Sequence, residues 1–186
     1  MKSLTYNQAY SLLEKSNNLT KKEVGETLAK SVGFYEVLLE DKETLFHLLY
    51  QSTAHLRILT PLKGYKNHHY TLENVVDRMI ENQWTFEDLA NGRIKGDYQQ
   101  EFFKQCQTIY QNYDPEKTNY LLLRPFSDRS RYFCPSALFY IEDGGHRTLV
   151  TAYLIKTNQL TFTPIKTILC LPNQHKKGFD KLKVYL

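Results

Sequence analysis

The sequence predicts an α+β fold, in which a helical N-terminal region packs on a small mixed sheet. Before residue 113, apolar side chains recur mostly at helical spacing. After residue 118 the pattern changes to short apolar runs, a glycine pair, a segment of helical length and a further apolar run. We therefore divide the chain into a helical region, 1–113, and an α/β core, 114–186. We expect the two to share one hydrophobic centre, because 186 residues suffice for one good core.

The N-terminal region begins with three predicted helices. The first covers residues 4–17. The second starts after Thr20 in a capping-box pattern and ends at Gly33, because glycine commonly follows the last turn of a helix. The third covers residues 44–59, where leucines recur on or near one face. The segment 34–39 is compatible with either a helix or a strand.

Residues 60–69 interrupt the helical pattern. They include Pro, Gly, two Lys and two His, and no acidic residue. This composition is typical of a solvated loop, and it would also suit a basic lip beside an anion site. His68 and His69 are adjacent, but no third ligand stands at a recognisable metal-site spacing, so we predict no metal there.

Three further helices complete the helical region. They are predicted from Thr71 to about Gln83, from Thr85 to about Gly92, and over residues 97–113. The last of these carries an aromatic stripe at helical spacing, which is more typical of core packing than of a ligand platform. The Asp-Pro pair at 114–115 ends it, because the residue before proline disfavours the helical conformation.

The α/β core is organised around a glycine turn. Residues 137–141 form an apolar run predicted as a buried strand, residues 142–145 (Glu-Asp-Gly-Gly) end it, and residues 146–155 have the length of a helix. Two glycines let the backbone take positive φ and approach a ligand closely. A helix N-terminus offers N–H donors and partial positive charge, to which His146 and Arg147 add their side chains. We predict a phosphate site here, and an ordinary turn without ligand is the alternative.

The segment 127–131 lies between the first two predicted strands of the core, and three arginines fall in it or shortly before it. Arg124, Arg129 and Arg131 fall within eight residues, near the glycine turn if the strands pair as expected. They are suited to clamping a phosphate, and equally to lying in solvent on a loop.

The core resembles the ParB/sulfiredoxin superfamily over residues 119–172. In that family a strand leads into a Gly-x-His/Arg-Arg turn, and the helix that follows cradles nucleotide phosphates at its N-terminus. The resemblance implies a nucleotide such as ATP or CTP as ligand, with Mg²⁺ as a compatible ion. The motifs that carry it are Leu121-Leu-Leu-Arg-Pro125, Leu138-Phe-Tyr-Ile-Glu-Asp-Gly-Gly-His-Arg147, Ala152 and Phe162-Thr-Pro-Ile-Lys-Thr-Ile168. The phosphate-binding residues it implies are Gly144, Gly145, His146 and Arg147, with Thr148 and Arg124 beside them.

Two departures from the family limit what the resemblance implies. Sulfiredoxins carry Gly-Cys-His-Arg, whereas Gly145 occupies the place of the cysteine here, so we do not expect sulfiredoxin reductase activity. ParB proteins carry Gly-Glu-Arg-Arg followed by a helix-turn-helix DNA reader, whereas only a short basic tail follows Pro172 here.

Glu142, Asp143 and His146 are the candidate catalytic groups. A carboxylate there could hold Mg²⁺ against phosphate oxygens or act as a base, and Asp143 equally suits a helix-capping role. His146 could donate to a phosphoryl oxygen while Arg147 neutralises developing charge.

Three classes of function follow. The first is a nucleotide-dependent phosphotransferase, nucleotidase or nuclease, the second is a non-catalytic nucleotide- or DNA-binding module, and the third is a protein-interaction domain. The intact Gly-Gly-His-Arg disfavours the third, and the absent DNA reader disfavours the second.

Composition adds broad limits. The net charge of +4 and the lysine-rich tail permit nucleic acid as a further partner. Three cysteines without a Cys-x-x-Cys pair indicate a reducing compartment. The N-terminus lacks the apolar run of a signal peptide, and no stretch approaches the ~20 apolar residues of a membrane span. We therefore expect a cytoplasmic protein without a membrane partner, and the oligomeric state stays open.

Overall fold

The structure is a computed structural model that describes residues 1–16, 21–50, 71–93, 97–115, 117, 120–125 and 139–172. Helices and strands are mixed within this part of the chain, which confirms the predicted α+β class. The predictions for the Thr20 cap, for residues 51–69, for Arg129 and Arg131 and for the tail beyond Pro172 lie outside the described residues.

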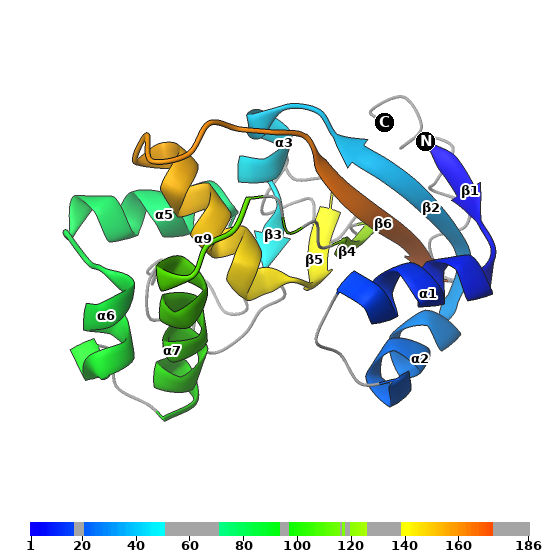
Figure 1. The fold of residues 1–186 in the computed structure, drawn as a ribbon, viewed down its shortest axis with the longest axis horizontal. Coiled ribbons are helices and arrows are strands. Elements are labelled where there is room, and N and C mark those ends of the chain that lie inside the picture. Colours follow the sequence, from blue (N-terminus) through cyan, green and yellow to red (C-terminus); the bar gives the residue numbers. More distant parts are fainter. Residues whose placement is uncertain are drawn as a thin grey trace, which may run out of the picture.

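A mixed sheet forms the centre of the fold (Figure 1). Its six described strands lie in the order β1-β2-β6-β4-β5-β3. β6 runs antiparallel to β2 and parallel to β4, and β5 runs antiparallel to β4 and parallel to β3. The strands are β1 (Lys2–Leu4), β2 (Ser31–Leu39), β3 (Leu49–Tyr50), β4 (Leu121–Pro125), β5 (Phe139–Asp143) and β6 (Ile165–Pro172).

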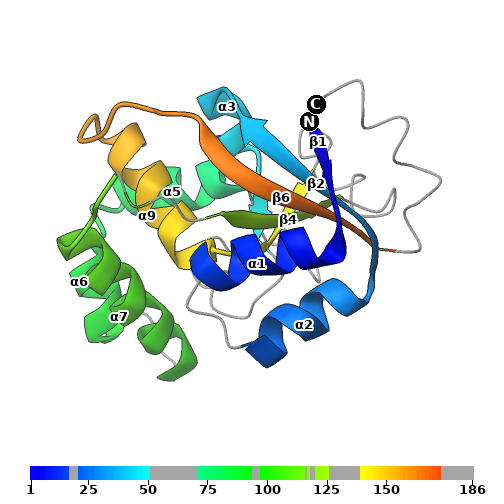
Figure 2. The same cartoon turned by 45° about the vertical axis from the view of Figure 1, so that its right-hand side comes forward.

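Helices pack on both faces of this sheet. In Figures 1 and 2, α1 and α2 lie together on one side of the sheet, and α5, α6, α7 and α9 gather on the other. The helical elements are α1 (Tyr6–Ser16), α2 (Lys21–Ala29), α3 (Lys42–Phe46), α5 (Leu72–Glu81), α6 (Phe86–Asp88), the π-helical turn η1 (Leu89–Arg93), α7 (Asp97–Gln111) and α9 (Gly145–Lys156).

Two of the predicted helix starts are confirmed by their caps. The hydroxyl oxygen of Thr71 accepts the backbone N–H of Asn74 at 3.3 Å, at the start of α5. Thr85 and Asp88 form a reciprocal capping box at the start of α6. Because such short polar side chains satisfy N–H groups that have no partner inside the helix, these boundaries could be predicted locally.

Two predicted helices end earlier than predicted, because residues distant in sequence pair with the segments that follow them. The helix predicted to reach Gly33 ends at Ala29, and Val32 and Gly33 belong to β2, which pairs with β6 along its length. The helix predicted to begin at residue 44 ends at Phe46. It gives way to β3, in which Leu49 pairs with Tyr140 of β5. The N-terminal region therefore contributes three strands to the sheet and is not purely helical.

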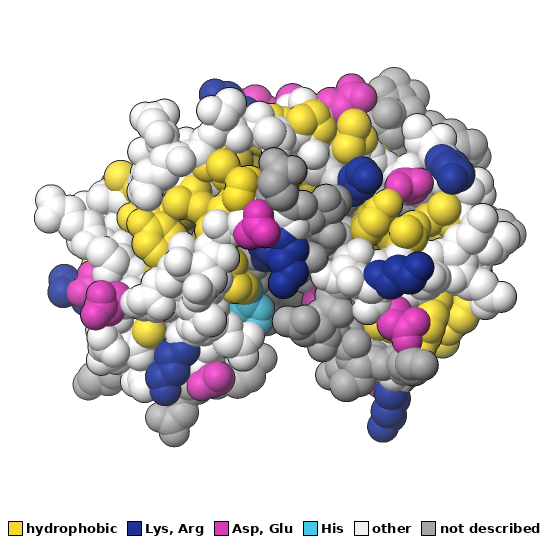
Figure 3. Space-filling view, viewed as in Figure 1, with side chains coloured by type: hydrophobic (Ala, Val, Ile, Leu, Met, Phe, Trp, Pro, Cys, Tyr) yellow, Lys and Arg dark blue, Asp and Glu magenta, His cyan; other side chains and the backbone are white. Residues whose placement is uncertain are grey.

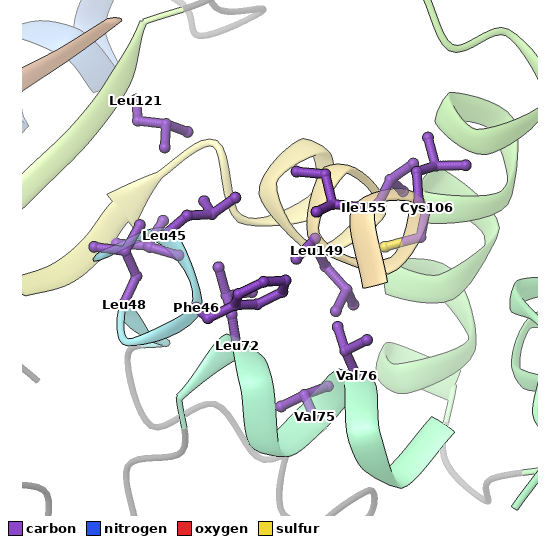
Figure 4. Close-up of a cluster of buried hydrophobic side chains, with 14 of the residues drawn as sticks. Leu45, Phe46, Leu48, Leu72, Val75, Val76, Cys106, Leu121, Leu149 and Ile155 are labelled. Carbon is purple, nitrogen blue, oxygen red and sulfur yellow. The ribbon is translucent and has the colours of Figure 1, made fainter. Parts of the chain in front are cut away.

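Apolar side chains are buried on both faces of the sheet. On one face, the core formed with α3, α5, α7 and α9 includes Leu121 and Leu123 of β4. Figure 4 shows Leu149 of α9 and Leu72 and Val76 of α5 directed into this core. Leu122 alternates with its neighbours and packs on the opposite face, against α1 and α2. The N-terminal and C-terminal parts of the chain thus share their cores.

The sheet brings three chain segments to one edge. β4 and β6 are parallel, and Leu121 at the start of β4 lies opposite Thr167 near the start of β6. β5 is antiparallel to β4, so its last residue, Asp143, pairs with Leu122 at this same edge. The glycine turn and α9 therefore begin where β4 and β6 begin. This edge holds the candidate site.

Candidate anion-binding site

The glycine turn has the left-handed backbone that the sequence predicts. Gly144 occupies the N-cap position of α9 with φ of 89° and ψ of 12°, a conformation that favours glycine. A Cβ atom at this position would lie 2.6 Å from Cδ2 of Leu121, closer than real contacts allow. Gly144 is therefore needed by its backbone conformation and by its packing against β4.

Thr148 closes the first turn of α9. Its backbone N–H and its hydroxyl both donate to the carbonyl oxygen of Gly144, at 2.9 and 2.7 Å. This pair of bonds holds the glycine turn against the helix. Thr148 is buried, and its side chain lies on the flank of α9 that faces β4 and β6.

His146 docks α9 on α7. Its ring lies 4.2 Å, centroid to centroid, from the ring of Phe102, with an angle of 32° between their planes. The carbonyl oxygen of His146 also lies 4.0 Å from the thiol sulfur of Cys106. Burial lowers the pKa of the His146 imidazole, because the charged form loses its hydration there. The neutral imidazole is thus the form that this packing favours.

Arg147 joins α9 to the segment that precedes β4. Its Nη2 atom donates to the backbone oxygen of Asp114 at 2.6 Å and to that of Lys117 at 2.8 Å. The guanidinium also lies over the ring of Tyr113, 5.4 Å from its centroid. Arg147 is therefore a structural anchor as well as a candidate ligand-binding residue.

Arg124 and Glu142 form a pair of their own. Arg124 Nε lies 2.5 Å from Glu142 Oε2, and the guanidinium sits 4.3 Å from the centre of the Tyr140 ring. Arg124 follows Leu122 by two residues, so it lies on the sheet face opposite the core that contains α9. The pairing of β4 with β5 shifts register between Leu122 and Leu123. Such irregularities commonly redirect a nearby side chain.

A pocket of about 110 Å³ lies beside α9 at the sheet edge described above. Three cationic side chains line it, Lys117, Arg147 and Lys166, and no Asp or Glu is among its lining residues in the described part of the chain. Figure 3 shows dark-blue Lys or Arg side chains near the middle of the view, with apolar surface and one magenta Asp or Glu side chain beside them. The remaining lining residues are Tyr113, Pro115, Leu121, Thr148, Thr151, Ile155, Leu160, Thr163, Pro164 and Ile165.

Hydroxyl groups add polar contacts to the pocket. Tyr113 Oη and Thr151 Oγ1 are 2.9 Å apart and share a hydrogen bond. Thr148 is committed to Gly144, whereas among the described residues no hydrogen bond is recorded for the Thr163 hydroxyl. Lys117 and Lys166 are exposed, and within the described ranges neither is recorded in an ion pair. Within the described residues, the pocket therefore combines positive charge without a lining carboxylate and available donors.

The structure brings together only part of the predicted site. Arg147 and Thr148 line the pocket, and Gly144 and Gly145 stand directly before them in the chain. Lys117 and Lys166 were missed. Lys117 is a single lysine in an unremarkable segment, and Lys166 lies in a motif of the resemblance that implies no ligand contact for it. The parallel pairing of β4 with β6 brings the two segments together. Six predicted site residues are not among the residues lining this pocket: Glu142, Asp143, Gly144, Gly145, His146 and Arg124.

Neither a metal site nor a membrane-spanning helix is found among the described residues. Among the residues that the structure describes, no group of three His, Cys, Asp or Glu side chains is placed to hold a metal ion. Over the same residues, no helix combines the length and apolar character needed to cross a membrane. Comparison of the chain with protein-family models, curated proteins and solved structures found no match.

Proposed function

We propose that this protein binds a small phosphate-bearing molecule, such as a nucleotide, and that the phosphate is held beside α9. The observation that carries the proposal is the charge of the pocket, where Lys117, Arg147 and Lys166 are lining residues without a lining carboxylate. Like charges that share a pocket repel one another, and a bound anion converts that repulsion into attraction.

Several features favour phosphate over other anions. A phosphate group carries three acceptor oxygens and more than one negative charge near neutral pH, so it can satisfy several donors at once. The lining provides donors of different kinds: a guanidinium, two ammonium groups and the Thr163 hydroxyl. The positive end of the α9 dipole adds to the same field, because Arg147 and Thr148 belong to its first turn.

The resemblance to the ParB/sulfiredoxin superfamily points the same way. It implies phosphate contact at the start of the helix that follows the glycine turn, and two residues of that turn of helix, Arg147 and Thr148, line the pocket. The support comes from the coincidence of two independent arguments, one from the sequence motif and one from charge.

Binding without turnover is the form of the proposal that the geometry favours. Of the candidate acids and bases, Glu142 is paired with Arg124, and His146 stacks on Phe102. Neither lines the pocket, and no other carboxylate or imidazole does so among the described residues. A phosphotransferase, nucleotidase or nuclease would need such a group near the phosphate.

A thermal-shift panel tests the proposed function. Inorganic phosphate, ATP and CTP, each with and without Mg²⁺, should raise the melting temperature of the wild-type protein. At 100 times its Kd a ligand stabilises by about 2.7 kcal/mol, which corresponds to roughly 5–11 °C for a chain of this size.

Variants at two exposed lysines locate the effect. The Lys166→Met variant should lose most of the shift, because Lys166 lines the pocket. The matched control, Lys104→Met, removes the same charge from an exposed position of α7 outside the pocket lining and should keep the shift. No stabilisation by any phosphate ligand would reject the function, and equal shifts in both variants would reject this location.

A further inference from the structure

The size of the pocket limits what can enter it. Its volume is about 110 Å³. A cavity of about 150 Å³ accommodates a benzene molecule, whereas sites that enclose a drug-sized ligand occupy about 300–1,000 Å³. A complete nucleotide therefore does not fit inside. One phosphate group fits, with the rest of the ligand outside the mouth.

The charge of the pocket favours a phosphate with one ester bond. A phosphate monoester carries about −1.5 to −2 at pH 7, because its second pKa is near 6, whereas a diester has a single ionised oxygen. Lys117 and Lys166 face the pocket together with Arg147, so three positive charges are available. A dianion balances this field better than a monoanion does.

Arg147 can bind a ligand without releasing its structural contacts. Nη2 uses its two hydrogens on the carbonyl oxygens of Asp114 and Lys117. A guanidinium has five N–H donors, so three remain on Nε and Nη1. The segment that carries Lys117 is thereby held to α9. The N–H donors of Nε and Nη1 stay available to phosphate oxygens.

The rest of the wall contains apolar side chains and hydroxyl groups, most of which are already bonded. Thr148 donates to Gly144, and Tyr113 and Thr151 share a hydrogen bond. The apolar lining side chains, which offer no donor or acceptor, are Leu121, Ile155, Leu160 and Ile165. Because only a phosphate group fits inside, the base of a nucleotide lies outside this wall. Selection among bases generally requires polar groups placed against the base edges.

We propose that the pocket takes the terminal, singly esterified phosphate of its ligand and is indifferent to the base. This inference rests on the proposed function, because it specifies which phosphate-bearing molecules the same pocket accepts. The ligand class is therefore phosphate monoesters, including nucleoside monophosphates, and inorganic phosphate serves as a probe because it carries a comparable charge.

Isothermal titration calorimetry on the full chain tests the inference with matched ligands. AMP and CMP differ in base and should bind within about threefold of one another. Cyclic AMP keeps the adenosine of AMP but carries a diester, and it should bind at least about tenfold more weakly. AMP affinity should also fall as the pH drops below about 6, where the monoester gains a proton, and cyclic AMP affinity should not follow it.

The outcomes separate the inference from the function on which it rests. Equal affinity for AMP and cyclic AMP, or more than about tenfold preference between AMP and CMP, would overturn the inference and leave phosphate binding in place. No binding of inorganic phosphate, AMP, CMP or cyclic AMP would overturn both. The preference for AMP over cyclic AMP should shrink in Lys166→Met and persist in Lys104→Met, and a preference unchanged in both would refute the assignment to this pocket.

Discussion

Arg147 Nη2 donates to the backbone oxygen of Asp114 at 2.6 Å, across a sequence separation of 33 residues. A second bond from the same nitrogen reaches the backbone oxygen of Lys117. Together they fasten the chain between α7 and β4 to the first turn of α9. The residue that the sequence marks as a phosphate ligand thus also positions Lys117, a second cation of the pocket.

Arg147→Ala should weaken both folding and binding. Loss of hydrogen bonds from a charged group is expected to lower the free energy of unfolding by about 1–3 kcal/mol, and toward the lower end here because the bonds are exposed to solvent. Affinity for inorganic phosphate should fall by roughly ten- to a hundredfold. Urea denaturation and calorimetric titration of the same variant measure the two effects.

Arg147→Lys provides the control for this variant. Lysine keeps the charge but has three donors on one nitrogen instead of five on three nitrogens, so it cannot bond both carbonyl oxygens from one position and present separate donors to the phosphate. It should recover more of the binding than of the stability. A destabilised Arg147→Ala protein that binds phosphate as the wild type does would show that Arg147 is structural alone.

Gly144→Ala should destabilise the fold. The backbone there has φ of 89°, and an added Cβ would meet the Leu121 side chain at 2.6 Å. Strain of this kind costs on the order of 1–3 kcal/mol, before any displacement of Leu121 is included. Gly25→Ala is the matched control, because its Cβ would lie 3.7 Å from Tyr6 Oη, an ordinary contact, within α2.

Of the two alanine variants, only Gly144→Ala should lower the melting temperature. Alanine exceeds glycine in helix propensity by about 1 kcal/mol, so Gly25→Ala should be neutral or stabilising. A Gly144→Ala protein as stable as the wild type would contradict the left-handed turn before α9.

His146 should make stability depend on pH in mildly acidic solution. Burial lowers its pKa below the ordinary value of 6.5. Above about pH 6.5 both folded and unfolded forms are neutral, and below it the unfolded form gains a proton first. The free energy of unfolding should therefore fall as the pH is lowered from 6.5 toward the folded-state pKa.

His146→Phe should flatten this dependence while it keeps a ring against Phe102. Urea denaturation of both proteins at several pH values between about 5 and 7.5 measures the difference. The carboxyl groups of Asp41 and Asp88, whose pKa values are lowered from 3.8 by N-cap hydrogen bonds, lose their contributions only in more acidic solution. Equal slopes in the two proteins would show that His146 is not the group responsible.

Arg124→Met should leave phosphate affinity unchanged. Arg124 pairs with Glu142 on the sheet face opposite the core that contains α9, away from the pocket lining. Both side chains are about a quarter exposed, so breaking the pair should lower the free energy of unfolding by roughly 1–2 kcal/mol, less than a fully buried pair would lose. Calorimetric titration decides the point. A large loss of phosphate affinity without a loss of stability would show that Arg124 belongs to the phosphate site.

Local chemistry made much of the fold predictable. Thr71 and Thr85 indicate helix starts, because their side chains bond to groups three residues away. The glycine pair predicts the left-handed residue, Gly144, before α9. Val32 and Leu49 show the limit. Both stand in apolar patterns compatible with a helix, yet they lie in strands because β6 and β5 supply partners more than 90 residues away in sequence.

The candidate site was predictable where it is contiguous in sequence and unpredictable where it is assembled. Arg147 and Thr148 follow the glycine turn directly, so the motif identified them. Lys117 and Lys166 join them only because β4 and β6 run parallel and start at the same edge of the sheet. A single lysine before a strand, as Lys117 is, or within one, as Lys166 is, carries no local signal of such a meeting.

A titration of the ¹⁵N-labelled protein with inorganic phosphate, followed by two-dimensional NMR, tests the central claim most directly. If phosphate binds beside α9, the amide signals of Lys117, Thr148, Thr151 and Lys166 should shift together and saturate along one binding curve. Signals of Tyr140 and Cys170, which lie in the sheet outside the pocket lining, should stay in place. Uniform small shifts without saturation, or shifts centred on Arg124 and Glu142, would contradict a phosphate site in this pocket.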